Sequence, residues 1–274
     1  MTDLVTLRSR IHAVGFGTPS LLAGAVGFAG LTALLAQVSI PVPWTPVPLT
    51  LQVLGVVLAG TILGPRFGAL SMLLYVLAGA LGFHAFAPSA DAYNAGTFWS
   101  ADRWHVLVPD AVRHTGFTAG YLLGYPLTAA FVGWALRKPG DKLGIATTWA
   151  LGALMATLVA ALLFLAAGNS LTDSGDYATG LGWTWLFVAA FLAIAPLAAW
   201  LLRHRAGRPA LRAYLVVLAG MMLLYLPGAI VLKWALGWSW TKSFALGAAV
   251  FLPFDALKAG VAVAACTAFL ETDT

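Results

Sequence analysis

The stretch PVPWTPVPLTLQVLGVVLAGTILGPRFGALSMLLYVLAGALG (residues 41–82) decides the fold class of this chain. It contains one apolar run, residues 50–63, and most of a second, residues 67–86, and Gly64 and Pro65 lie between them. A membrane-crossing helix needs about 20 mostly apolar residues, and the first run is short by that measure. Because a proline restricts the residue before it, we expect a break at Gly64 and a first run that is tilted or partly re-entrant. The four prolines of residues 40–49 favour a stiff, extended strap on the outer side.

Comparable apolar runs occur on both sides of this stretch, at residues 21–39, 118–136, 144–167, 183–203, 211–236 and 243–270. The 274 residues are 61% hydrophobic and only 9% charged, whereas a soluble domain carries roughly 25% charged residues. These proportions exclude a soluble enzyme, a nucleic-acid-binding protein and a disordered chain. We therefore expect an all-α, polytopic helical bundle in the lipid bilayer, with eight spans and a single domain over residues 1–274.

Lysines and arginines indicate how the bundle is oriented. With eight spans, ten of these residues fall on the side that holds both termini and four fall on the other side. Because cytoplasmic loops carry an excess of lysine and arginine, this difference places both termini in the cytoplasm.

A carboxylate and an ammonium group lie within the last apolar run. Asp255 and Lys258 are three residues apart, so a helix places both on one face. Pro253 suits the first turn of a helix, so we expect a short segment before it and a helix after it. Charged groups at membrane depth are costly and mark functional sites by default. A structural ion pair that ties two helices together is the alternative.

Small residues form a second pattern. Ala25, Ala29 and Ala33 recur one helical turn apart in the first span, and such a stripe lets another helix approach closely. The stripe could be a docking face for a partner, but ordinary packing within the bundle explains it equally well. The same holds for the glycines at positions 120, 124 and 133.

Several enzymatic signatures are absent from the sequence. It contains no GxxxxGK[ST] loop for ATP phosphates, no HExxH zinc motif and no GxSxG hydrolase elbow. We therefore expect a protein that is not an enzyme and has no cofactor or metal.

Four segments, in order, resemble the BioY family, whose members are biotin-specific S components of energy-coupling factor (ECF) transporters. The opening signature is similar to residues 41–82, and the family's GGYLxGFxxAA segment is similar to TAGYLLGYPLTAAFVGWAL (118–136). The penultimate family helix resembles VVLAGMMLLYLPGAIVL (216–232), and its closing LPFxPGDLxKA motif resembles GAAVFLPFDALKAGVAV (247–263).

Three departures from the family pattern stand out. Family members have six spans, so residues 21–136 and 211–270 would form the core, with an inserted helical pair at about 144–203. A polar stretch, 87–117, replaces the family's glycine-rich loop. Phe254 stands where glycine is usual, which would narrow the pocket or shift the turn before Asp255.

The resemblance implies high-affinity biotin binding and uptake across the cell membrane. Asp255 would accept the ureido N–H groups of biotin, and Lys258 would donate to the ureido oxygen or to the carboxylate. Tyr121 would line the pocket, the strap with Trp44 would cover it, and Gln52 is a further binding candidate. Trp44 could instead anchor the chain at the interface, and Gln52 could instead bridge helices.

The implied partners are a transmembrane coupling subunit and two ATPase subunits, with the alanine stripe as the docking face. Two other classes of function stay open at this point. One is a secondary transporter of a small carboxylate or vitamin, coupled to protons or sodium, with Asp255 as the protonation site. The other is a membrane scaffold subunit that transports nothing.

Overall fold

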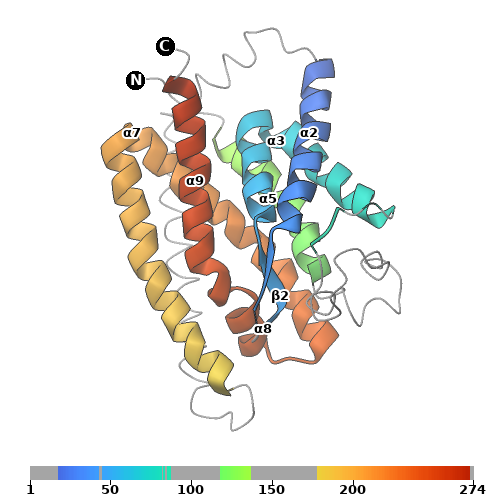
Figure 1. Cartoon of the computed structure of the whole chain (residues 1–274), viewed down its shortest axis with the longest axis vertical. Helices are drawn as coiled ribbons and strands as arrows, with labels where there is room; N and C mark the ends of the chain where they lie inside the picture. The colour runs from blue at the N-terminus through green and yellow to red at the C-terminus, as the bar shows by residue number, and fades with distance from the viewer. Residues whose placement is uncertain are drawn as a thin grey trace.

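The computed structural model of this chain describes residues 18–42, 45–81, 83, 85–87, 118–136 and 178–271. The expected span at 144–167 and residues 88–117 of the polar stretch lie outside these ranges, so the structure does not test the count of eight spans. Within the described ranges the chain is mostly helical (Figure 1).

The proline-rich strap forms a small hairpin after helix α2 (Thr18–Gln37). Strand β1 (Ser39–Val42) pairs antiparallel with β2 (Thr45–Thr50), and Ser39 lies opposite Thr50. In a two-stranded ribbon both strands are edges, so a proline can occupy a position where no N–H is needed. The extended strap is thus confirmed, but the expectation of an all-α protein needs this hairpin added.

Helix α3 (Gln52–Ala80) contains the break that the sequence predicts. Gly64 has φ 80° and ψ −175°, a conformation that glycine adopts readily, and Pro65 begins the second half of the element. Figure 1 shows the bend: the first half runs upright beside α2, and the second half turns away from it.

Helix α5 (Ala119–Ala135) packs closely against two neighbours through its small residues. A side chain on Gly60 of α3 would lie 2.5 Å from the carbonyl oxygen of Ala129. A side chain on Gly124 would lie 2.7 Å from Cα of Leu224, on α7. Side chains on Gly120 and Gly133 would likewise collide with the backbones of α7 and α3. The glycines at 120, 124 and 133 therefore act as packing positions within the bundle, which is the plainer of their two interpretations.

Helix α7 (Ala178–Leu236) is two helices that meet at Gly207, where φ is 78°. At 1.5 Å per residue its 59 residues would extend about 90 Å, roughly three times the hydrocarbon thickness of a bilayer. Figure 1 shows the first half rising along one flank and the second half descending behind α9. The two halves correspond to the expected spans at 183–203 and 211–236.

The last part of the chain is interrupted as predicted. Helix α8 (Trp240–Gly247) is followed by a 3-10 turn, Ala249–Phe251, and by α9 (Leu252–Glu271). Pro253 and Asp255 lie in the first turn of α9, where the positive end of the helix dipole favours an anion.

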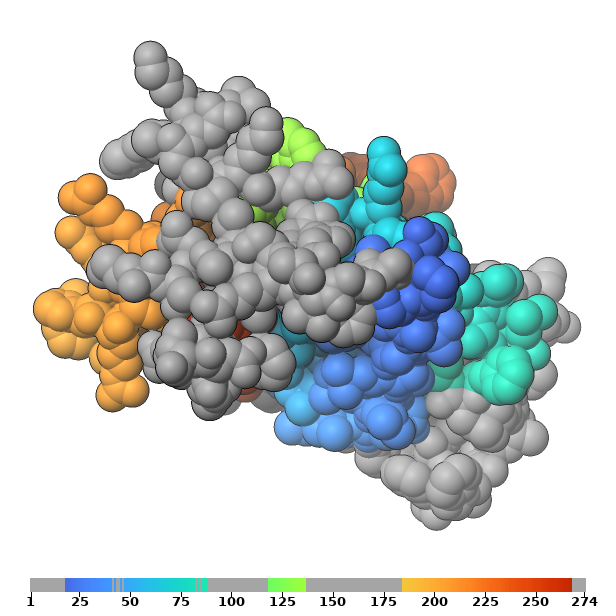
Figure 2. All heavy atoms as spheres, turned by 90° about the horizontal axis from the view of Figure 1, so that it is seen from above, coloured from blue at the N-terminus to red at the C-terminus, as the bar shows by residue number. Residues whose placement is uncertain are grey.

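Four helical stretches of the described chain are long and apolar enough to cross a membrane: Thr18–Gln37, Gln52–Ala80, Thr184–Leu236 and Trp240–Thr267. Large apolar side chains on their outer faces are exposed, among them Leu34, Leu77 and Val261. Exposed leucine and valine at this density fit a surface that faces lipid tails. Seen from above, the first half of α7 lies at one edge of the bundle, and the second half of α3 lies at the opposite edge (Figure 2).

Candidate functional site

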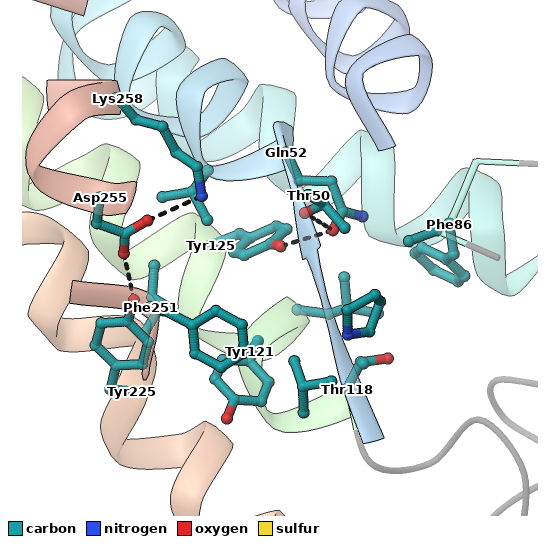
Figure 3. Close-up of a pocket in the computed structure, with 16 residues that line it drawn as sticks. Thr50, Gln52, Phe86, Thr118, Tyr121, Tyr125, Tyr225, Phe251, Asp255 and Lys258 are labelled. Atoms are coloured by element: carbon teal, nitrogen blue, oxygen red, sulfur yellow. Dashed lines mark hydrogen bonds and ion pairs between the residues drawn. The ribbon is translucent and has the colours of Figure 1, made fainter. Parts of the chain in front are cut away.

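A pocket that is partly open to the outside lies where β2, α3, α5, α7 and α9 meet (Figure 3). The described residues that line it are Val47, Pro48, Thr50, Gln52, Val53, Phe86, Ala87, Thr118, Tyr121, Leu122, Tyr125, Leu224, Tyr225, Phe251, Asp255 and Lys258. A mostly apolar lining with a few polar groups is typical of a site for a small molecule.

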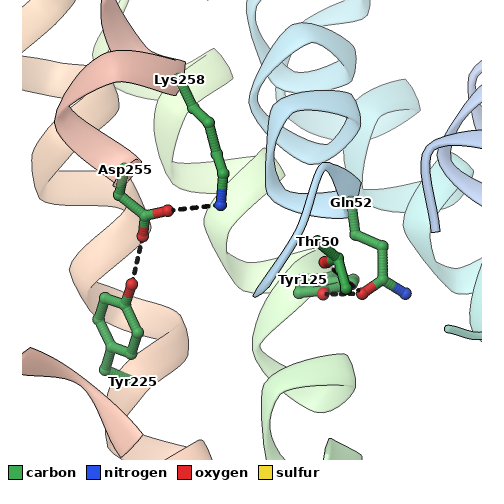
Figure 4. A network of polar contacts seen from close by, with 6 residues as sticks. All are labelled: Thr50, Gln52, Tyr125, Tyr225, Asp255 and Lys258. Atoms are coloured by element: carbon green, nitrogen blue, oxygen red, sulfur yellow. Dashed lines mark hydrogen bonds and ion pairs between the residues drawn. The ribbon is translucent and has the colours of Figure 1, made fainter. Parts of the chain in front are cut away.

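One wall of the pocket carries the charged pair of α9. The Lys258 ammonium lies 2.9 Å from Oδ1 of Asp255, and the Tyr225 hydroxyl of α7 donates to Oδ2 (Figure 4). The Asp255 residue is only 1% exposed, and the Lys258 side chain is 11% exposed. Lys258 is the one cation among the described residues that line the pocket. An ammonium has three donors, so Lys258 can bind a ligand while it keeps its bond to Asp255.

The opposite wall is a neutral hydrogen-bond network around Gln52, at the start of α3. Its Oε1 accepts hydrogen bonds from Thr50 Oγ1 at 2.9 Å and from Tyr125 Oη at 3.2 Å. Its Nε2 donates to Tyr75 Oη at 2.6 Å, and Tyr75 itself lies outside the pocket lining. Strand β2 thus contributes a polar group, Thr50, to this wall as well as the apolar Val47 and Pro48.

Aromatic rings line the pocket between the two walls. Tyr121 and Tyr225 pack edge to face with their ring centroids 6.2 Å apart, and Tyr225 stacks on Phe251 at 6.4 Å. The Tyr121 hydroxyl donates to the carbonyl oxygen of Gly247 at 2.6 Å, which fixes the ring. Gly228 makes room for it, because a side chain there would collide with the Tyr121 ring.

Four of the predicted binding residues line this one pocket: Gln52, Tyr121, Asp255 and Lys258. The fifth, Trp44, lies outside the described residues, so its role stays a prediction. The tyrosines at 75, 125 and 225 and Thr50 are polar partners in the site that the sequence did not predict. A buried tyrosine hydroxyl needs a hydrogen-bond partner, and this requirement was the available signal.

A model of the BioY family matches residues 10–97 and 177–272, which together are more than half of the chain. The chain belongs to the BioY family. The match leaves out residues 98–176, which include α5 and Tyr121, and it takes in residues 177–210. The unmatched residues 98–176 do not coincide with the helical pair expected as an insertion at about 144–203. That insertion stays a prediction.

Curated relatives carry BioY names. A probable biotin transporter BioY of Pyrococcus horikoshii is 38% identical over 111 residues, which are 40% of this chain and 56% of that protein. The biotin transporter BioY of Thermotoga maritima is 37% identical over 111 residues, covering 40% and 54%. That of Lactococcus lactis is 26% identical over 126 residues, covering 46% and 56%. The chain thus spans about half the length of the curated relatives it matches.

A solved structure shares the fold. It is a crystal structure of the S-component for biotin from an ECF-type ABC transporter, with a TM-score of 0.50 and 17% sequence identity over 92% of this chain and 90% of that one. Together with the apolar helices, the family membership makes this chain a multi-pass protein of the cell membrane.

Phe254 departs from the BioY pattern, and the expectation that it narrows the pocket is wrong. It is 36% exposed, is not part of the pocket lining, and packs against Phe187 of α7 with ring centroids 6.2 Å apart. Asp255, the next residue, still lies in the first turn of α9. Phe254 therefore contacts the first half of α7.

The alanine stripe of α2 is only partly on the surface. Ala25 is fully buried, so it is a packing position and is not available to a partner. Ala29 and Ala33 are half-buried and line an apolar groove between α2 and the second half of α3. If a partner helix docks on the stripe, these two alanines are the ones it can reach.

Proposed function

We propose that this chain is the substrate-specific component for biotin of an ECF-type transporter in the cell membrane. The BioY family membership and the relatives' names support the substrate. The chain itself would bind and carry the vitamin without any catalytic step.

The observation that carries this proposal is the pocket with one charged wall, one neutral polar wall and aromatic rings between them. Biotin has a ureido group with two N–H donors and a carbonyl, an apolar thioether ring and chain, and a carboxylate. A molecule that is polar at both ends and apolar in the middle suits such a lining.

In this proposal Asp255 accepts a ureido N–H, and Lys258 donates either to the ureido oxygen or to the carboxylate. Both side chains point toward the cavity in Figure 3. A hydrogen bond to a charged group contributes about 1.5–3 kcal/mol, so these two contacts would account for much of the affinity. Tyr121 and Phe251 would pack against the apolar part of the ligand.

The proposal also assigns partners. The sequence has no phosphate-binding loop, so energy from ATP would come from two ATPase subunits through a transmembrane coupling subunit. The coupling subunit would contact α2 at Ala29 and Ala33. The arginines near the bend of α7 would face the cytoplasm, as the count of positive charges predicts.

Binding of radiolabelled biotin to the purified chain tests the substrate. We expect saturable binding that unlabelled biotin competes away and that lipoic acid does not, because lipoic acid has a sulphur ring and a carboxylate but no ureido group. A chain that binds no biotin, or that binds both compounds equally, would contradict the proposal.

A further inference from the structure

Tyr75 is buried behind the neutral wall, where its hydroxyl and its ring contact residues that line the pocket. It is 1% exposed, and its hydroxyl accepts a hydrogen bond from Gln52 Nε2 at 2.6 Å. Its ring stacks on Tyr125 at 6.2 Å and meets the edge of Phe86 at 5.5 Å. Gln52, Tyr125 and Phe86 all line the pocket, but Tyr75 does not.

The nitrogen of the Gln52 amide donates to Tyr75, which does not line the pocket. In Figure 4 the Gln52 nitrogen points away from Tyr125, and the oxygen faces Tyr125 and Thr50. The hydroxyls of Thr50 and Tyr125 both donate to that oxygen. A hydroxyl has one hydrogen, so these two groups have only lone pairs left for a ligand. The neutral wall therefore offers hydrogen-bond acceptors.

We propose that Tyr75 is a positioning residue that holds the Gln52 amide so that this wall accepts a hydrogen bond from a ligand N–H. The inference rests on the proposed function, because the N–H donors of biotin are those of its ureido group. One ureido N–H would face Asp255 and the other would face the wall of Thr50, Gln52 and Tyr125. Without the Tyr75 hydroxyl, Gln52 keeps only two of the three side-chain hydrogen bonds that hold its amide beside Thr50 and Tyr125. The amide can then move away from these two hydroxyls, which become free to reorient as donors.

The test uses Tyr75→Phe in the full-length chain, which keeps the ring and removes the hydroxyl. We expect it to weaken the binding of biotin and of desthiobiotin by about tenfold, since both compounds keep both ureido N–H groups and one hydrogen bond is lost. Two mono-N-methyl biotins each lack one ureido N–H. For the isomer methylated at the nitrogen that faces the wall, the affinity of Tyr75→Phe should differ from that of the parent by less than twofold. The isomer methylated at the other nitrogen should bind Tyr75→Phe about tenfold more weakly than it binds the parent, as biotin does.

Two further variants separate positioning from a general structural effect. Tyr214→Phe is the matched control, because Tyr214 is also buried but does not line the pocket, and it should leave all affinities unchanged. In a Gln52→Met background, Tyr75→Phe should weaken biotin binding by less than twofold, because the amide that Tyr75 positions is absent. If Tyr75→Phe does not fold, Gln52→Met alone should show the same discrimination between the two methylated isomers.

Several results would overturn the inference. They are unchanged biotin affinity in Tyr75→Phe, an equal loss for biotin and both methylated isomers, and a full tenfold loss in the Gln52→Met background. If neither methylated isomer binds the parent, the test is the effect of Tyr75→Phe on biotin affinity in the Gln52→Met background. A parent chain that binds no biotin would instead refute the proposed function, so the two failures are distinguishable.

Discussion

Asp255→Asn should weaken biotin binding by at least about 100-fold and also lower the melting temperature of the purified chain. The substitution removes a charged acceptor from the pocket, which is worth about 1.5–3 kcal/mol for each hydrogen bond. It also leaves the Lys258 ammonium without the anion that lies 2.9 Å away. Removing one partner of a buried ion pair typically costs about 3–5 kcal/mol, because the other charge stays desolvated. Titration with radiolabelled biotin and a thermal melt in detergent measure the two effects.

The double variant Asp255→Asn with Lys258→Met separates these effects. Both charges are then gone, so the melting temperature should recover much of its loss, since a buried ion pair can be replaced by neutral groups at little cost. Biotin binding should not recover. A single variant that binds like the parent, or a double variant that regains affinity, would show that Asp255 serves only as the structural partner of Lys258.

Lys258→Met should weaken biotin binding by roughly 10- to 100-fold, the factor that corresponds to one charge-assisted hydrogen bond. Methionine keeps most of the aliphatic length and removes the ammonium, so the loss reports on the charge and its donors. Lys233→Met is the matched control, because Lys233 is at the end of α7, bonds to the Trp238 carbonyl and lies outside the pocket lining. Equal affinities of the two lysine variants for biotin would remove Lys258 from the site.

The charged wall of the site could be predicted from sequence because its determinants are local. Asp255 and Lys258 are one helical turn apart, and Pro253 marks the start of their helix, so their common face follows from helix geometry alone. Tyr225 was not predicted as their partner. It lies 30 residues away in the sequence, and α7 must pack against α9 before its hydroxyl can reach Asp255.

The neutral wall depends on longer-range structure. Gln52 was a candidate through the resemblance to the BioY family, but Tyr75 is separated from it by 23 residues and by the bend at Gly64. The sequence predicts that bend but not its direction. Tyr125 reaches Gln52 only because α5 packs closely on α3 through glycines, and this contact is invisible in the spacing of either helix.

Comparison with the family motif predicted that Phe254 narrows the pocket, whereas helix geometry predicts that it lies on another face of α9. Successive residues of a helix point about 100° apart, so a neighbour of Asp255 need not share its face. Leu257 and Val261 follow Phe254 at helical spacing, and both are exposed. Ala259 and Ala262 follow Asp255 and Lys258 at such spacing and are buried. The apolar face of α9 that contains Phe254 therefore points away from the pocket.

An experimental structure of the purified chain with biotin bound tests the central claim most directly. The account predicts biotin between the two polar walls, with its ureido group within hydrogen-bond distance of Asp255 and of the wall formed by Thr50, Gln52 and Tyr125. Biotin bound elsewhere on the chain, or a pocket in which Asp255 and Lys258 touch only each other while biotin is bound, would contradict it.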